Sequence, residues 1–121
     1  MIHVRTGKVQ IYDTDASGLV LFSAPLRWFV DAEDGYNEAF GLWEVLGLNR
    51  TFAEAGPMAP TRAYEVWLDS PMQFHDRYEQ QTWISRVGRT SYTVSHLVTV
   101  EGRRCIRGSV RRSLVERRPD G

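Results

Sequence analysis

Residues 23–41 read SAPLRWFVDAEDGYNEAFG, and this stretch decides the fold. Ser23 suits a helix N-cap, Pro25 fits the first turn, where its missing N–H costs nothing, and Gly41 suits the helix end. We therefore predict a helix from Ser23 to about Phe40. Its apolar stripe at helical spacing comprises Leu26, Phe29, Val30, Tyr36 and Phe40. The residues predicted to lie away from the stripe are Trp28, Asp31, Asp34, Gly35 and Glu38. So long an apolar stripe requires other elements to wrap the helix.

Strand patterns surround this helix. Alternating or β-branched segments occur before it, at residues 3–11, and after it, at residues 61–68, 78–87 and 91–100. A hairpin turn at residues 101–103 leads into a last strand. In that strand Ile106, Val110 and Leu114 share one face, and Cys105 belongs to the opposite, mostly wet face. We predict one α+β domain over residues 1–116, with a long central helix wrapped by a curved antiparallel sheet of about five strands. Residues 117–121 are expected to form a frayed tail.

Composition excludes several classes of function. The chain has 121 residues, with 15 basic and 15 acidic side chains, so no net field attracts nucleic acid. No segment reaches the roughly 18 apolar residues that a membrane span requires. A single cysteine and the lack of an apolar N-terminal segment favour a cytoplasmic location. The three histidines, His3, His75 and His96, show no metal-ligand spacing, so we expect surface or packing roles for them and no metal site.

The loop before the helix is the least regular part of the pattern. Residues 12–20 read YDTDASGLV and break any strand or helix period. With the aromatic-rich segment Leu26-Arg27-Trp28-Phe29 that follows, this loop resembles the signature of the 4-hydroxybenzoyl-CoA thioesterase family of the hot-dog superfamily. That signature is an Asp-x-Asp-x-x-Gly loop between a first strand and a long helix. The resemblance implies a hot-dog fold and hydrolysis of acyl thioesters.

The same resemblance assigns the catalytic residues. The second aspartate of the signature, Asp15, is implied to be catalytic, and Asp13 to be a structural loop residue. A carboxylate can attack the thioester carbonyl or activate water, and both roles stay open. The unpaired amides of the helix N-terminus can stabilise the oxyanion, with the backbone N–H of Phe22 as the implied donor. Many bacterial relatives carry a histidine at the position of Phe22, and an aromatic residue there resembles the aryl-acyl branch.

Further expectations concern substrate and assembly. By resemblance, Arg89, Thr90 and Ser91 contact the nucleotide of coenzyme A. The expected substrate is an acyl-CoA or acyl-carrier-protein thioester, with no cofactor, because coenzyme A is part of the substrate. An uncovered sheet edge favours a homodimer or homotetramer. The resemblance implies a site at the protomer interface.

Two functional alternatives remain open, a hydratase or dehydratase of acyl thioesters and an acyl-binding protein without turnover. Glu33 is a separate question, because it falls inside the apolar stripe of the helix, where an unpaired carboxylate is costly. A related thioesterase branch places its catalytic glutamate on this helix. We expect instead that Glu33 pairs with an arginine or with Asn37 at the protomer interface.

Overall fold

A computed structural model describes residues 1–42 and 56–117. The chain runs through β1 (Ile2–Lys8), a 3₁₀ turn η1 (Ile11–Asp13), α1 (Ala24–Ala39), β2 (Gly56–Met58), β3 (Thr61–Leu68), β4 (Arg77–Val87), β5 (Ser91–Val100), β6 (Arg103–Ser113) and β7 (Val115–Arg117). Arg117, the first residue of the predicted frayed tail, instead pairs with Gly56 as the last residue of β7, and residues 118–121 lie outside the described residues. None of the described helices is both long and apolar enough to span a bilayer.

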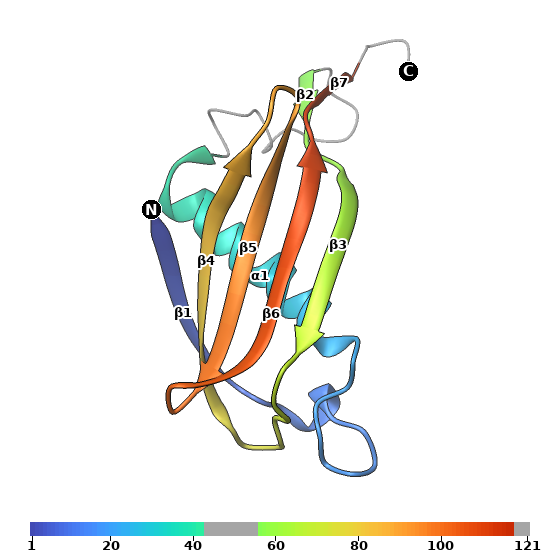
Figure 1. Cartoon of the computed structure of the whole chain (residues 1–121), viewed down its shortest axis with the longest axis vertical. Helices are drawn as coiled ribbons and strands as arrows, with labels where there is room; N and C mark the ends of the chain where they lie inside the picture. The colour runs from blue at the N-terminus through green and yellow to red at the C-terminus, as the bar shows by residue number, and fades with distance from the viewer. Residues whose placement is uncertain (43–55, 118–121) are drawn as a thin grey trace.

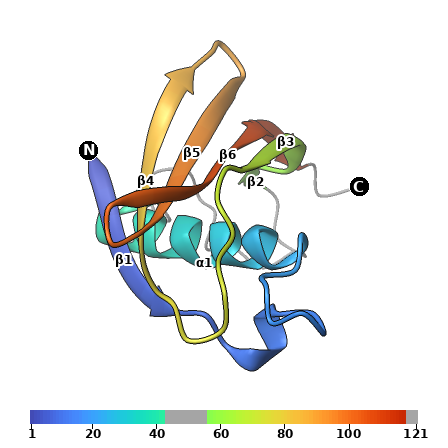
Figure 2. The same ribbon diagram turned by 60° about the horizontal axis from the view of Figure 1, so that its bottom comes forward.

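The five long strands form one antiparallel sheet in the order β1-β4-β5-β6-β3. The helix α1 lies across one face of this sheet (Figure 1). The view of Figure 2, turned about the horizontal axis from that of Figure 1, shows the sheet curving around the helix. The short strands β2 and β7 pair separately. The predicted α+β arrangement, a long helix wrapped by a curved five-stranded antiparallel sheet, is confirmed.

The core lies between α1 and the inner face of the sheet. Alternation along β5 is regular, and its inward residues are Tyr92, Val94, His96, Val98 and Val100. The helix buries Ala24, Pro25, Trp28, Phe29, Ala32, Glu33 and Tyr36 against them. These buried positions recur every three or four residues, as one face of a helix requires.

The predicted phase of the helix is wrong at two positions. Trp28, predicted to lie away from the stripe, is only 2% exposed and stacks on Tyr78 with ring centroids 4.6 Å apart. Val30, predicted to belong to the stripe, is 59% exposed. The large indole ring fills the space between helix and sheet, so the helix turns Trp28 inward and Val30 outward.

The first strand is shorter than predicted. β1 ends at Lys8, and the Val9 N–H then donates to the Asp76 carbonyl at 2.8 Å. Ile11, predicted as an apolar strand residue, begins the 3₁₀ turn and is 65% exposed. The chain leaves the sheet early because this turn must carry it to the start of α1.

The expectation of a wet face for Cys105 is wrong. The register between β5 and β6 shifts so that Val98 pairs with Ile106 and Thr99 with Arg104, which leaves Cys105 without an opposite residue. Such a bulge places two successive side chains on the same side of the sheet. Cys105 and Ile106 are therefore both buried in the core.

The close packing of helix on sheet depends on Gly108 in β6. A Cβ atom at this position would lie 2.3 Å from two ring carbons of Phe29. The Phe29 ring in turn stacks on His96, with ring centroids 4.2 Å apart. Only glycine leaves space for the aromatic ring at this point of the strand.

Candidate active site

The loop between η1 and α1 is held as a tight turn around Asp15. The Asp15 N–H donates to the Leu19 carbonyl at 3.0 Å, and the Gly18 N–H donates to the Asp15 carbonyl at 3.0 Å. Gly18 has a φ of 81°, which favours glycine at this position. Leu19 also forms a bridge to Gln73, in the connection between β3 and β4. The loop is thereby held by hydrogen bonds within itself and by its bridge to the β3–β4 connection.

The Asp15 carboxylate is exposed and accepts hydrogen bonds within the turn. Its Oδ1 accepts from the Ser17 N–H at 2.8 Å and from the Ser17 hydroxyl. The Ser17 side chain and backbone bonds hold the pKa of Asp15 below its usual value, because they stabilise the charged form. Asp15 therefore offers an ionised carboxylate, and it also caps a turn.

Asp13 has the structural role expected of it. Its side chain is only 2% exposed and forms an ion pair with Arg27 of α1. The other carboxylate oxygen accepts the Gln10 N–H at 2.9 Å, and the Asp13 carbonyl accepts the Leu21 N–H at 2.8 Å. Asp13 thus ties the 3₁₀ turn to the first turns of α1, and so sets where the Asp15 loop stands against the helix.

The N-terminus of α1 follows Asp15 within nine residues of sequence, since the helix begins at Ala24. Ser23 occupies the N-cap position, but its side chain makes no capping hydrogen bond. Among the described residues, the Phe22 N–H donates no hydrogen bond, and the Phe22 side chain is 80% exposed. The unpaired amides of a helix start attract negative charge, so this end can stabilise an oxyanion.

The residues predicted to bind the nucleotide lie at the other end of the sheet. Arg89 and Thr90 are exposed in the turn between β4 and β5, where the Gly88 N–H donates to the Ser91 carbonyl at 2.8 Å. This turn is at the top of Figure 1, whereas the loop between η1 and α1 is at the bottom. The 11 residues of β4 separate the two ends by roughly 35 Å, at about 3.3 Å per residue. The fold of the single chain therefore does not bring Asp15 and Arg89 together.

The structure also assembles a buried polar cluster, of which the sequence predicted only the pairing of Glu33 with an arginine. Glu33, only 5% exposed, accepts from Arg112 Nε at 3.0 Å, and its second oxygen lies 3.6 Å from His96 Nε2. Glu33 thus pairs with an arginine of its own chain. The sequence contains some of the signals for this cluster. Glu33 lies within the apolar stripe of the helix, and His96 and Arg112 occupy inward positions of β5 and β6.

The neighbours of His96 determine the role of its Nδ1 atom. Arg5 Nη1 donates to Gln80 Oε1 at 2.9 Å, which leaves the Gln80 amide nitrogen facing His96 Nδ1 at 3.3 Å. An amide nitrogen can only donate, so Nδ1 is the acceptor in this contact. Nε2 faces Glu33 Oε2 at 3.6 Å and makes no hydrogen bond among the described residues. The ring is enclosed by Phe29, Gln80 and Thr82 and is only 2% exposed.

Comparison with solved structures defines the fold. A probable thioesterase from Bartonella henselae superposes with a TM-score of 0.81 at 20% identity, over 95% of this chain and 92% of that one. The BH1999 gentisyl-coenzyme A thioesterase superposes with a TM-score of 0.78 at 21% identity, over 93% of this chain and 88% of that one. Slr0204, a 1,4-dihydroxy-2-naphthoyl-CoA thioesterase from Synechocystis, superposes with a TM-score of 0.79 at 13% identity, over 95% of this chain and 82% of that one. The chain has the hot-dog fold. No protein-family model matches the chain. No curated protein matches it either.

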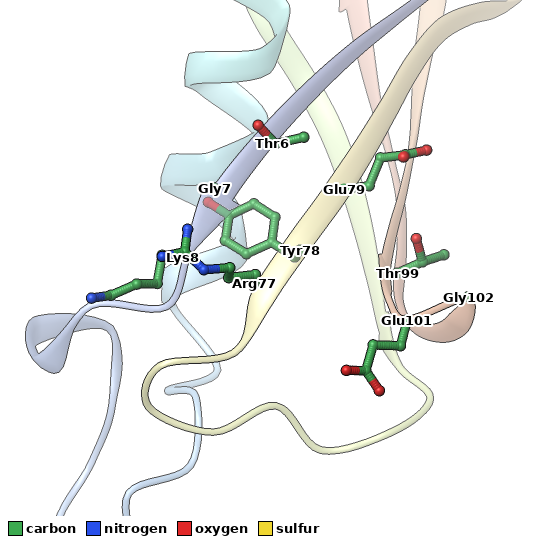
Figure 3. A pocket seen from close by; sticks show the side chains of 9 residues that line it. All are labelled: Thr6, Gly7, Lys8, Arg77, Tyr78, Glu79, Thr99, Glu101 and Gly102. Carbon is green, nitrogen blue, oxygen red and sulfur yellow. The ribbon is translucent and has the colours of Figure 1, made fainter.

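The structure has a cleft of about 590 Å³ where β1 ends and β4 begins, beside the β5–β6 hairpin. In the view of Figure 3, Lys8 and Arg77 lie on one side of the Tyr78 ring, with Glu79 and Glu101 on the other. This cleft contains none of the predicted site residues. Within residues 1–42 and 56–117, no group of three or more His, Cys, Asp or Glu side chains is placed to hold a metal ion.

Proposed function

We propose that this chain hydrolyses acyl-CoA thioesters, with Asp15 as the catalytic carboxylate. One observation carries the proposal. An ionised, accessible Asp15 stands just before a helix start whose Phe22 N–H donates no hydrogen bond among the described residues, on a fold shared with named thioesterases. A carboxylate and an amide donor on one loop supply the two functions that acyl transfer needs.

The reaction adds water across the thioester and releases a carboxylic acid and a free thiol. Asp15 either attacks the carbonyl carbon, giving a mixed anhydride that water then hydrolyses, or removes a proton from the attacking water. In both routes negative charge develops on the carbonyl oxygen. The Phe22 N–H and the positive end of the α1 dipole are the proposed stabilisers of that charge.

The proposed substrates carry an aromatic acyl group on coenzyme A. Two of the structural neighbours are named for gentisyl-CoA and 1,4-dihydroxy-2-naphthoyl-CoA, both aromatic thioesters. Phe22, where many bacterial relatives of the signature have histidine, agrees with such a group. Arg89, Thr90 and Ser91 are the proposed contacts to the nucleotide, since a guanidinium matches phosphate geometry.

A second protomer is proposed to complete the site. β3 is an edge strand on which every residue but Val66 is exposed, and the large side chains of Tyr64 and Trp67 are each more than half exposed. A long apolar edge of this kind favours pairing with another copy. A two-fold pairing of antiparallel β3 strands turns the partner end for end. The partner's Arg89 end then approaches the Asp15 loop, which no single protomer achieves.

The test is release of free thiol from a panel of acyl-CoA esters, followed with a chromogenic thiol reagent. Asp15→Asn should lower kcat by about 100-fold or more while KM stays within about threefold, as for loss of a catalytic acid–base group. Asp76→Asn is the matched control, because Asp76 also caps a turn, accepting the Gln73 N–H at 2.9 Å. This control should retain wild-type kcat.

The outcomes separate the alternatives. Wild-type kcat in Asp15→Asn would show that Asp15 is only a turn residue. Binding of acyl-CoA without thiol release would favour the acyl-binding protein. A hydratase or dehydratase needs a histidine with a carboxylate at the substrate, and the one such pair found among the described residues, His96 with Glu33, is enclosed beneath α1.

A further inference from the structure

A separate apolar pocket adjoins the Asp15 loop. It has a volume of about 280 Å³ and lies between that loop, the connection from β3 to β4, and β6. Its apolar lining residues are Leu19, Val20, Leu68, Pro71, Met72 and Ile106. Asp69 and Ser70 are the polar ones, and the Asp69 carboxylate is already paired with Arg104 and Arg107. The pocket therefore suits an uncharged, apolar group.

The pocket has a buried floor and an open mouth. Met72 and Ile106 are each only 2% exposed, whereas Leu19 is 42% and Leu68 is 55% exposed. A ligand group entering past Leu19 and Leu68 would reach the Met72 thioether and the Ile106 side chain. Methionine adapts well to irregular shapes and contacts aromatic ring edges favourably.

Backbone hydrogen bonds fix this pocket to the candidate catalytic residue. The Asp15 N–H donates to the Leu19 carbonyl at 3.0 Å, and the Val20 N–H donates to the Met72 carbonyl at 2.8 Å. Leu19 is thus one hydrogen bond from Asp15, and Val20 is one hydrogen bond from the pocket floor. A thioester carbonyl beside Asp15 would have its acyl group within reach of the pocket mouth.

The volume limits the group that fits. An apolar cavity of about 150 Å³ holds a benzene molecule, and pockets for drug-sized ligands span about 300–1,000 Å³. At about 280 Å³ the pocket suits a single aromatic ring or a short aliphatic chain. A long fatty acyl chain exceeds it.

We propose that this pocket receives the acyl group of the substrate, and that Leu68 at its mouth selects single-ring and short acyl groups against larger ones. The inference rests on the proposed thioester hydrolysis and names its substrate class. Leu68 is a specificity residue in this proposal and takes no part in the chemical step.

The first experiment fills and widens the pocket. Leu68→Trp should lower kcat/KM for benzoyl-CoA by about 10-fold or more and leave acetyl-CoA within about threefold, in the range that apolar pockets discriminate. Leu68→Ala should raise kcat/KM for a two-ring naphthoyl-CoA. Val4→Trp is the matched control, because Val4 is 50% exposed on the distant edge strand β1. Equal effects of Leu68→Trp on both substrates would overturn the proposal.

The second experiment does not depend on turnover. The chain has three methionines, Met1, Met58 and Met72, so methyl-¹³C labelling gives one probe in the pocket and two outside it. The probe ligand is S-phenacyl-coenzyme A, a thioether that carries a ring and a carbonyl but no thioester. Its binding should shift the Met72 methyl signal, assigned with Met72→Leu, and leave Met1 and Met58 unchanged.

These two readouts distinguish the two proposals. A Met72 shift in a protein that releases no thiol would support the pocket and contradict hydrolysis. Hydrolysis with an unmoved Met72 signal at saturating probe would contradict the pocket and leave hydrolysis standing. A protein that does not bind the probe at all would overturn the pocket.

Discussion

Glu33 and His96 face each other beneath the central helix, with Glu33 Oε2 3.6 Å from His96 Nε2. They come from α1 and β5, and Arg112 of β6 holds the other Glu33 oxygen at 3.0 Å. A carboxylate in a helix–sheet core is costly unless it is paired, so this arrangement connects three elements through one buried charge.

Loss of that carboxylate should destabilise the fold. Glu33→Ala removes the hydrogen-bonded partner of the partly buried Arg112, so we expect the free energy of unfolding to fall by about 3 kcal/mol. Urea denaturation followed by circular dichroism measures the change. Asp34→Ala, at an exposed neighbouring position of α1, is the control and should change the stability little. A loss below about 1 kcal/mol for Glu33→Ala would mean that the pair stabilises little.

Because Phe29 packs directly on Gly108, replacing this strand glycine by alanine should lower the stability of the protein. Alanine normally strengthens a strand relative to glycine, but a Cβ at Gly108 would lie 2.3 Å from the Phe29 ring. Gly108→Ala should therefore destabilise the protein by about 2 kcal/mol through overpacking. Adding Phe29→Leu should cost less in the Gly108→Ala background than in wild type, because the two residues share one contact. Strictly additive losses in thermal denaturation would contradict the contact.

The pH dependence of activity should depend on the hydrogen bonds from Ser17 to Asp15. Its hydrogen bonds lower the pKa of Asp15, so the ionised carboxylate, and with it activity, should persist below the usual range for aspartate. Ser17→Ala removes the hydroxyl bond, raises the pKa of Asp15 and moves the acid limb of kcat/KM to higher pH. Carboxyl ¹³C titration measures that pKa directly.

Ser23→Ala is the control for this prediction, because the Ser23 side chain makes no capping hydrogen bond. A carboxyl titration that moves in Ser17→Ala while the kcat/KM profile stays fixed would show that Asp15 is not the group that controls activity.

Mixing of subunits tests whether the site is shared. Asp15→Asn and Arg89→Ala should each reduce activity, because Arg89 is a proposed phosphate contact. Random mixing of the two variants makes half of the dimers heterodimers. If each site takes Asp15 from one protomer and Arg89 from the other, one of the two sites in every heterodimer contains both wild-type residues. Co-refolding the two variants should then restore about a quarter of wild-type activity. No recovery, with mixing shown by mass spectrometry, would place both residues of a site on one protomer.

Much of the fold was predictable because its signals are local. Ser23, Pro25 and Gly41 bound the helix within a residue or two, and alternation along residues 91–100 matched β5 residue for residue. The loop of turn-forming residues around Asp15 was also visible, whereas the different role of Asp13 was implied by the resemblance alone. The chemistry of Asp15 rests on resemblance to a family signature and stays a prediction.

Other features were not predictable for identifiable physical reasons. Trp28 and Val30 are two residues apart in a helix, and periodicity alone does not say which of two adjacent apolar stripes packs on the sheet. Cys105 is buried by a bulge, which depends on how β6 meets β5 and not on alternation within β6. Both errors concern the phase of an element and leave its identity unchanged.

By itself, the sequence determined which segments become helix, strand and turn, because capping residues, turn formers and apolar periodicity act over a few neighbouring positions. Only the tertiary structure decided which side chains meet. Glu33 and Arg112 are 79 residues apart in the chain, and Phe29 meets Gly108 across the same interface. Such pairings depend on strand order, register and the rotation of the helix about its axis, which form only when the elements pack together.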